Sequence, residues 1–173
     1  MCDHRTTRRE LLSYLDSLGL ATRTVEHTPV ATVAANKALR GELPGAHTKN
    51  LFLKDKKGGL WLVVALEDRQ IDLKALRTLL GAPALSFARP DVMRSVLGIE
   101  PGSVTPFAVI NDRQRLVTVI LDAQMMTMDP LNFHPLENTA TTAISPAALH
   151  RFLDALDHPP RTISFGDDEP QRS

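Results

Sequence analysis

The chain has 173 residues, 43% of them hydrophobic, which suits one domain with a real core and is short for two. Its 20 basic and 20 acidic residues balance, so any contact with nucleic acid must come from a local basic patch. The single cysteine, Cys2, has no partner for an intrachain disulfide, and no apolar run approaches the roughly 20 residues that span a bilayer. Together with an N-terminus that lacks a signal-peptide core, these features favour a cytoplasmic protein with no membrane partner.

Five helices are predicted, four from capping residues and apolar side chains at helical spacing, and the one over 32–40 from its alanines and the three-residue spacing of Lys37 and Arg40. They are expected over about 7–18, over 32–40, from Asp72 to Gly81, from Pro90 to Gly98, and from Ser145-Pro146 onwards. The first has the strongest signals, because Thr7 and Glu10 have the spacing of a capping box and Gly19 follows as a stop.

Six strands are predicted from short runs of apolar and β-branched residues. They are expected over 22–27, 50–55, 60–66, 107–110, 116–121 and 139–144. The strand over 60–66 is continuously apolar, so it should be central and covered on both faces. Hairpins between neighbouring strands favour a mixed α/β (α+β) fold: a single domain with a largely antiparallel mixed sheet surrounded by helices. The polar tail after Phe165 is expected to be disordered.

Several kinds of chemistry are not supported by the sequence. The six histidines have no metal-site spacing, Cys2 shows no sign of an activated thiolate, and neither a Gly-x-Ser-x-Gly elbow nor a phosphate-binding loop is present. Asp68 and Asp72, with Glu67 and Arg69 nearby, are interpreted as a solvated turn and a helix cap instead of an acid/base pair. No metal, no cofactor and no side-chain nucleophile is therefore expected.

The segment 43–54 combines turn residues with a cation and an amide. Lys49 and Asn50 directly precede the apolar run 51–53, so Lys49 is expected at the first position of a strand, after the turn-like Pro44-Gly45. A lysine there can anchor an anion through three N–H donors, or it can simply extend into solvent.

Two later loops have a similar character. In 101–106, Gly102 is expected to allow backbone angles and a close approach that other residues do not, and the loop to present N–H groups to an oxygen. Pro106 fixes the exit; alone, the pattern is often a plain turn. In 131–143, His134 lies among asparagines and threonines. These side chains either line a site or satisfy the backbone of turns.

Together these segments resemble the YbaK/ProX family, the free-standing relatives of the editing domain inserted in bacterial prolyl-tRNA synthetases. The matching strings are Gly45 to Leu53 (Gly-Ala-His-Thr-Lys-Asn-Leu-Phe-Leu), Gly102 to Pro106, Asn132 to Leu136 and Asn138 to Thr142. The resemblance covers roughly residues 20–165, with 1–19 as an N-terminal helix and 166–173 as a tail. The longer strings point to the ProXp-ala (PrdX) branch, whose members are trans-editing enzymes that hydrolyse alanine mischarged on proline tRNA.

The resemblance implies an aminoacyl-tRNA deacylase that releases alanine from Ala-tRNA(Pro) by water attack on the ester, with prolyl-tRNA synthetase as a further expected partner. Lys49 would hold the terminal phosphate or ribose, and Asn50 would lie beside the ester. The implied catalytic residues are Lys49, Asn50 and Gly102, and the implied substrate-binding residues are Lys49, Asn50, Phe52, Ser103, Val104, Thr105, Pro106 and His134. An aminoacyl ester is already activated, so positioning and oxyanion stabilisation suffice without a nucleophile.

Two further sets of residues are expected to serve recognition. The size-selective wall is assigned to Val33, Phe52 and Thr105, and the tRNA body to Lys37, Arg40, Lys54, Lys56 and Lys57. Three alternatives remain: a deacylase for Cys-tRNA(Pro) or another small aminoacyl-tRNA(Pro), such as one charged with 2-aminobutyrate, a tRNA-binding module without catalysis, and a small-molecule esterase.

Overall fold

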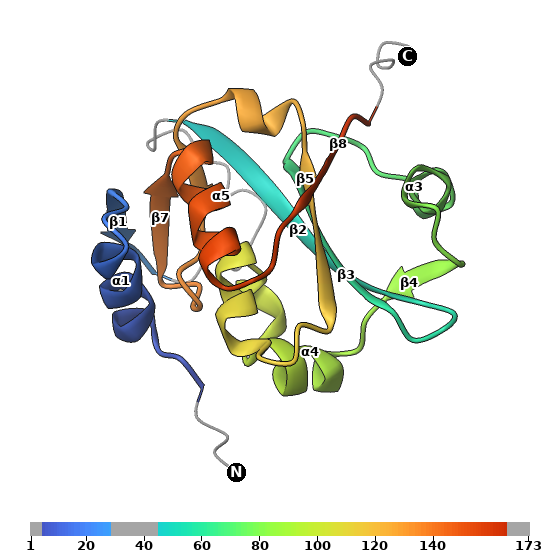
Figure 1. The fold of residues 1–173 in the computed structure, drawn as a ribbon, viewed down its shortest axis with the longest axis horizontal. Coiled ribbons are helices and arrows are strands. Elements are labelled where there is room, and N and C mark those ends of the chain that lie inside the picture. The colour runs from blue at the N-terminus through green and yellow to red at the C-terminus, as the bar shows by residue number, and fades with distance from the viewer. Residues whose placement is uncertain (1–4, 29–44, 166–173) are drawn as a thin grey trace.

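The computed structural model describes residues 5–28 and 45–165, and in these residues one eight-stranded mixed sheet carries helices on both faces (Figure 1). The strands are β1 (Thr22–Glu26), β2 (Ala46–Asp55), β3 (Leu60–Leu66), β4 (Leu85–Phe87), β5 (Val117–Asp122), β6 (Leu131–Phe133), β7 (Ala140–Ile144) and β8 (Arg161–Ile163). The α-helices are α1 (Arg8–Ser17), α3 (Leu73–Leu80), α4 (Pro90–Leu97) and α5 (Pro146–Ala155). The short 3₁₀ helices are η1 (Pro101–Ser103), η2 (Pro106–Asn111) and η3 (Met125–Thr127).

The sheet has the strand order β1-β7-β6-β2-β3-β5-β8, with β4 paired to β2. The pairings β1–β7, β6–β7, β2–β3 and β2–β4 are antiparallel, and β2–β6, β3–β5 and β5–β8 are parallel. The predicted mixed sheet is therefore confirmed, with antiparallel pairs in the majority.

Strand β3 lies in the middle of the sheet and is covered on both faces, as its apolar sequence predicts. Leu62 and Val64 belong to the main core, which α1, α4, α5 and η2 complete. Val63 points the other way, into a smaller core with Leu76 and Leu80 of α3. Figure 1 shows this division: α3 stands apart from the group formed by α1, α4 and α5. The main core forms the larger layer, and α3 covers the opposite face.

The predicted helix caps are confirmed. The Thr7 hydroxyl accepts from the Glu10 amide while the Glu10 carboxylate accepts from the Thr7 amide, which completes the capping box of α1. Asp72 caps α3 through the Lys74 amide, and Ser145 caps α5 through the Ala148 amide. Such caps depend on neighbours within one helical turn, so a sequence can reveal them.

The strand predicted over 107–110 is wrong, because these residues form the 3₁₀ helix η2. Pro106 occupies its first turn, and the Thr105 hydroxyl accepts from the Phe107 amide at its start. A short apolar run has the same appearance in a buried strand and in a buried helical turn, so periodicity cannot separate them. Three strands of three residues each, β4, β6 and β8, were not predicted, because they are too short to show alternation.

Some predictions fall on residues that the structure does not describe. The helix expected over 32–40, with Val33, Lys37 and Arg40, and the tail 166–173 lie outside the described residues. The division of the chain into 1–19, 20–165 and 166–173 stays a prediction. Within the described ranges, no helix has the length and apolar character that crossing a membrane requires.

Candidate functional site

The described part of the first segment, residues 45–54, lies beside the start of the segment 131–143, because β2 and β6 pair in parallel at their starts. The Thr48 hydroxyl donates to the Asn132 carbonyl oxygen at 2.9 Å, and the Asn132 side-chain amide donates to the Ala46 carbonyl oxygen at 3.0 Å. Asn132 is only 7% exposed, so these hydrogen bonds are shielded from water. Two strings far apart in the sequence are thus joined.

Gly45 makes this junction possible. Its φ of 102° lies in the left-handed region, and a Cβ on it would come within 2.5 Å of the Pro130 carbonyl oxygen. The next amide, of Ala46, donates to that oxygen at 2.8 Å. Only glycine suits both the backbone angle and the close approach.

The loop 101–106 joins the same place. A Cβ on Gly102 would lie 3.4 Å from Nδ2 of Asn138, so this loop touches the segment between β6 and β7. The Phe107 ring, directly after the loop, meets the Phe133 ring of β6 edge-on at 5.8 Å between centroids. All three segments identified in the sequence therefore converge.

Of the two reasons predicted for Gly102, the unusual backbone angles are wrong, because its backbone lies outside the left-handed region and forms part of η1. The close approach is found only as a contact of ordinary van der Waals length between the position that a Cβ would take and Asn138. The Ser103 amide donates to the Glu100 carbonyl oxygen at 2.9 Å. Within the described residues, the amides of Gly102, Val104 and Thr105 make no backbone hydrogen bond outside η1. That these N–H groups face a ligand oxygen stays a prediction.

The sequence predicts Lys49 as the first residue of its strand, and this is wrong. Lys49 is the fourth residue of β2, because pairing with β6 extends the strand back to Ala46. Successive strand residues alternate between faces. Asn50 therefore shares the main-core face with Phe52, whereas Lys49 shares the α3 face with Leu51. Adjacent in sequence, Lys49 and Asn50 point to opposite sides of the sheet.

Within the described residues, one edge of β2 is unpaired over the part that contains Lys49 and Asn50. On the side away from β3, β2 pairs with β6 at Ala46 and His47 and with β4 from Leu53 to Asp55. In the described part of the chain, no strand pairs with this edge from 48 to 51. A ligand lying along this gap could contact side chains from both faces.

The Lys49 ammonium donates to the backbone carbonyl oxygen of Arg69. Burial lowers the pKa of Lys49; the Asp68 carboxylate opposes this shift and the Arg69 guanidinium adds to it. The interpretation of Arg69 as part of a solvated turn is wrong: its side chain is 16% exposed and pairs with Asp122, which is fully buried. The sequence signal that could have indicated this pair is the position of Asp122, an acidic residue directly after the apolar run 116–121.

Asn50 and His134 each have a polar atom without a protein partner in the described ranges. The Asn50 Oδ1 atom is buried and accepts no hydrogen bond. In His134, Nδ1 lies 3.1 Å from the Ala140 carbonyl oxygen, so it carries the proton and leaves Nε2 unengaged. Burial lowers the pKa of His134, the Ala140 hydrogen bond opposes this, and His27, with its ring centroid 6.5 Å away, adds to it. Sequence reasoning did not identify His27.

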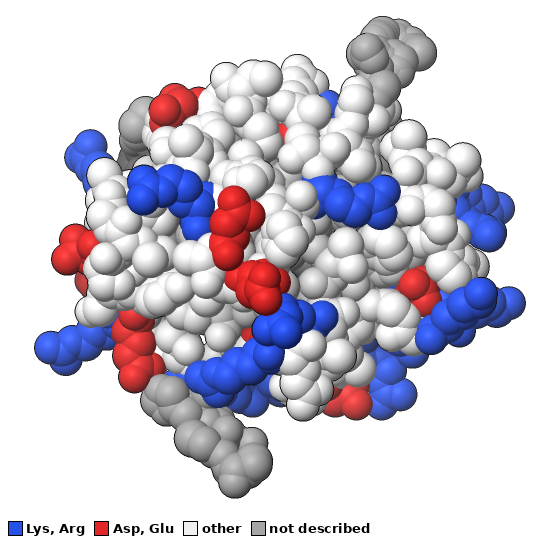
Figure 2. All heavy atoms as spheres, viewed as in Figure 1, with Lys and Arg blue, Asp and Glu red and all other residues white. Residues whose placement is uncertain are grey.

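The remaining predicted residues differ in exposure. Phe52, Ser103, Thr105 and Pro106 are buried, with Phe52 at 3% and Thr105 at 0%, while Val104 is half-buried. Lys54 is half-buried in β2, and Lys56 and Lys57 are exposed in the hairpin turn. On the face that Figure 2 shows, basic and acidic side chains are interspersed. None of these positions tests the predicted contacts with substrate or tRNA.

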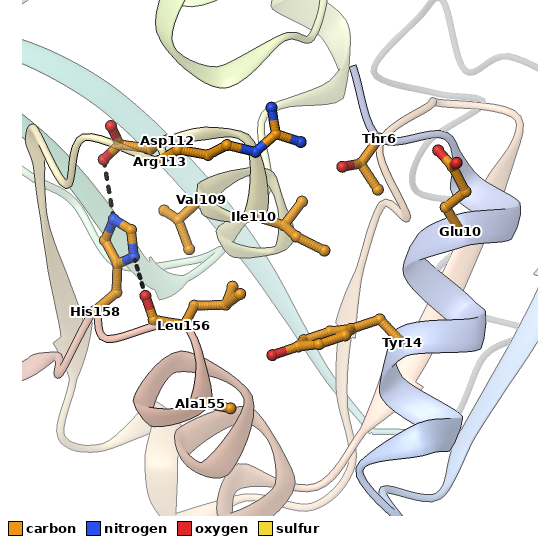
Figure 3. A pocket seen from close by; sticks show the side chains of 10 residues that line it. All are labelled: Thr6, Glu10, Tyr14, Val109, Ile110, Asp112, Arg113, Ala155, Leu156 and His158. Carbon is orange, nitrogen blue, oxygen red and sulfur yellow. Dashed lines mark hydrogen bonds and ion pairs between the residues drawn. The ribbon is translucent and has the colours of Figure 1, made fainter. Parts of the chain in front are cut away.

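A separate cavity of about 570 Å³ lies between α1, η2 and α5, away from the three converging segments (Figure 3). Its lining consists of Thr6, Glu10, Tyr14, Val109, Ile110, Asp112, Arg113, Ala155, Leu156 and His158. At its wall, Nε2 of His158 lies 3.0 Å from the Asp112 carboxylate, and both side chains are buried. The described residues contain no cluster of three or more His, Cys, Asp or Glu side chains that could hold a metal ion.

The comparisons with known proteins identify the family to which this fold belongs. Residues 27–152 match the family model of the aminoacyl-tRNA editing domain, and the chain belongs to that family. It is 39% identical over 160 residues to "Prolyl-tRNA synthetase associated domain-containing protein 1" of Danio rerio, covering 91% of this chain and 87% of that protein.

Two further similarities agree with this assignment. The chain is 35% identical over 149 residues to "Prolyl-tRNA editing protein ProX" of Acetoanaerobium sticklandii, covering 86% of this chain and 91% of that one. A solved structure described as "a putative trans-editing enzyme for prolyl tRNA synthetase" superimposes with a TM-score of 0.69 over 91% of this chain and 94% of its own. At 21% identity, that structure shows likeness of fold alone.

Proposed function

We propose that this protein is a trans-editing hydrolase of the ProXp-ala (PrdX) branch, which deacylates Ala-tRNA(Pro) in the cytoplasm. The observation that carries the proposal is the convergence of β2, the 101–106 loop and the 131–142 segment around Gly102, Asn138 and Asn132. The printed names of the relatives, which refer to prolyl-tRNA editing and to prolyl-tRNA synthetase, support the choice of tRNA(Pro) and of the synthetase as a partner.

In the proposed mechanism, Lys49 anchors the terminal phosphate or ribose of the tRNA at the open edge of β2. An ammonium group suits this role because it is a compact charge with three donors, of which Arg69 uses one. Asn50 reaches the ester from the other face of the strand, where its Oδ1 has no protein partner.

The ester itself lies against the 101–106 loop. The amides of Gly102 and Val104 polarise the carbonyl oxygen and stabilise the negative charge that water attack creates, which typically lowers a barrier by about 3–4 kcal/mol per donor. The Nε2 atom of His134 is free to accept from the substrate or from water. This arrangement requires no protein nucleophile, since an aminoacyl ester is reactive and the terminal ribose supplies its own 2′-hydroxyl.

The proposed specificity is a size sieve. The aminoacylation site of a synthetase that holds proline discriminates against alanine by only about 1–3 kcal/mol, so a second, smaller site is needed. Phe52 and Thr105, and Val33 outside the described residues, are proposed to form its wall. Phe52 and Thr105 are buried, and the close packing of a protein interior would suit a size filter.

The test is a panel of charged tRNAs: Ala-tRNA(Pro), Cys-tRNA(Pro), 2-aminobutyryl-tRNA(Pro) and Pro-tRNA(Pro). Wild-type protein should release alanine fastest and leave proline in place, and Lys49→Ala should lower the rate at least about 100-fold, as loss of an anchoring charge predicts. Lys74→Ala, on the exposed face of α3, is the matched control and should retain full activity. Equal rates for wild type and Lys49→Ala would remove Lys49 from the site.

The same panel, with a tRNA-binding assay and an assay on free aminoacyl esters, decides among the alternatives. Faster loss of cysteine or 2-aminobutyrate would change the substrate but keep the reaction. Salt-sensitive binding of tRNA without hydrolysis would indicate a binding module, and activity on free aminoacyl esters would indicate a small-molecule esterase. If Lys54, Lys56 and Lys57 contact phosphates, each alanine substitution should weaken tRNA binding and reduce its salt dependence by about one ion.

A further inference from the structure

The turn that follows β3 holds the Lys49 side chain. Its last residue, Arg69, supplies the carbonyl oxygen that accepts from the Lys49 ammonium, and the Arg69 amide donates to the Leu66 carbonyl oxygen at 3.1 Å. The Glu67 amide donates to the His47 carbonyl oxygen at 2.9 Å, which ties the turn to β2 itself. The position of one main-chain oxygen therefore decides where the ammonium points.

A buried ion pair fixes this turn. Asp122, the last residue of β5, accepts from Nε of Arg69 at 2.7 Å and from the Leu66 amide at 3.2 Å, and its other oxygen accepts from the Gln124 amide at 3.0 Å. The guanidinium also donates to Oε1 of Gln124 at 2.7 Å and lies 4.9 Å from the Phe165 ring centroid. Both ends of the turn, Leu66 and Arg69, are thus held by the same carboxylate.

Among the described residues, the charge of Lys49 has no carboxylate within ion-pair distance, although the Asp68 carboxylate lies near enough to oppose the lowering of its pKa. Its hydrogen-bond partner is a neutral carbonyl, and in the described ranges it makes no ion pair. An ammonium has three N–H donors, so two remain. A half-buried cation that is oriented by a carbonyl and not paired with a carboxylate is arranged to receive an anion from outside.

We propose that Arg69 and Asp122 are positioning residues for Lys49. Their ion pair holds the turn 66–69 so that the Arg69 carbonyl oxygen directs the ammonium toward the phosphate of a bound tRNA end. That the anion is a tRNA phosphate rests on the function proposed above; that the ion pair orients Lys49 does not.

Steady-state kinetics on Ala-tRNA(Pro) test the proposal. Asp122→Asn should raise KM about tenfold and leave kcat within about twofold, because a misplaced anchor weakens binding before chemistry. The double variant Lys49→Ala/Asp122→Asn should be no less active than Lys49→Ala alone, because both substitutions remove the same anchoring function. Arg69→Lys, which keeps the charge but lacks the planar fork, should give a smaller rise in KM in the same direction.

Asp112→Asn is the matched control for structural damage. Asp112 lies before the start of β5, the strand that Asp122 ends, and is 3% exposed. Its carboxylate accepts from the Leu116 and Val117 amides and from His158, far from Lys49. It should lower the melting temperature at least as much as Asp122→Asn while leaving KM unchanged. An equal rise of KM in both variants would mean general loosening and would overturn the proposal.

A measurement without substrate separates this inference from the proposed function. Reductive ¹³C-dimethylation labels the six lysines and leaves each ammonium one N–H, enough for the Arg69 carbonyl. In the ¹³C NMR spectrum, the methyl signal of Lys49, assigned with Lys49→Arg, should have a larger linewidth than the signals of the exposed lysines. In Asp122→Asn this linewidth should fall to that of the exposed lysines, whereas in Asp112→Asn it should not change. An unchanged Lys49 signal in Asp122→Asn would overturn the inference even if wild type deacylates tRNA, and the predicted narrowing would support it even if wild type does not.

Discussion

The two ends of strand β2 differ in how far the polar side chains are hydrogen-bonded within the protein. At its end, the Asp55 carboxylate accepts from the Lys57 amide at 2.8 Å, the Gly59 amide at 2.9 Å and the Trp61 indole at 2.9 Å. Nearer its start, the Asn50 Oδ1 atom is buried with no partner, and the Lys49 cation has only a carbonyl. The end that is satisfied stabilises the fold. The start retains unpaired groups that cost stability, and this is expected where a ligand completes the bonding.

The largest difference between the two ends is expected at their glycines. Gly45 and Gly58 both have positive φ, but a Cβ on Gly45 would meet the Pro130 carbonyl oxygen, whereas a Cβ on Gly58 would meet nothing within 4 Å. Gly45→Ala should lower the free energy of unfolding by at least about 3 kcal/mol, and Gly58→Ala by about 1 kcal/mol. Urea unfolding of both variants measures this. Equal losses would show that β2 and β6 can separate without cost.

A smaller effect, of opposite sign for activity and stability, is expected at Asn50. Asn50→Leu removes a buried oxygen that has no partner, so the free energy of unfolding should change by less than about 0.5 kcal/mol or rise. Deacylation should fall about tenfold or more, corresponding to about 1.4 kcal/mol.

Asn111 provides the contrast to Asn50. Its Oδ1 accepts from the Thr6 amide at 2.9 Å and its Nδ2 donates to the Leu97 carbonyl oxygen at 3.0 Å. Asn111→Leu should destabilise by about 1–3 kcal/mol, because two backbone partners are left unsatisfied, and should retain deacylase activity per folded molecule. If Asn50→Leu destabilises as much as Asn111→Leu, the Asn50 amide serves the fold and not the substrate.

The smallest effect is expected at Asp55 and depends on pH. The Trp61 hydrogen bond lowers the pKa of Asp55; burial opposes this, and the Gly59 and Lys57 amides add to the lowering. A carboxyl whose pKa is lowered by folding stabilises the protein above its unfolded pKa of about 3.9, and this contribution is lost as pH falls through the folded pKa.

Asp55→Asn should therefore cost about 1 kcal/mol at pH 7 and progressively less as pH falls below about 4. Denaturation followed by fluorescence of Trp61, the single tryptophan, measures both. A cost that is the same at pH 3 and pH 7 would mean that the carboxylate charge contributes nothing.

Much of the fold follows from local signals in the sequence. Thr7, Asp72 and Ser145 cap helices as predicted, and the apolar strand β3 is central. The errors lie where local signals are weak. Pro106 to Asn111 has the apolar character of a strand but forms a 3₁₀ helix, and β4, β6 and β8 arise from pairing with distant strands that periodicity cannot reveal.

The sequence by itself determined the class of protein and the three segments that converge, because the residues around Lys49, Gly102 and His134 form consecutive strings. Only the tertiary structure decided how these segments are arranged. Pairing with β6 moved Lys49 from the first to the fourth position of its strand, and strand alternation placed it opposite Asn50. Arg69, whose carbonyl oxygen accepts from Lys49, pairs with Asp122, 53 positions away, because β3 and β5 run in parallel and bring their ends together. Contacts of that sequence separation are set by packing and cannot be derived from local residue patterns.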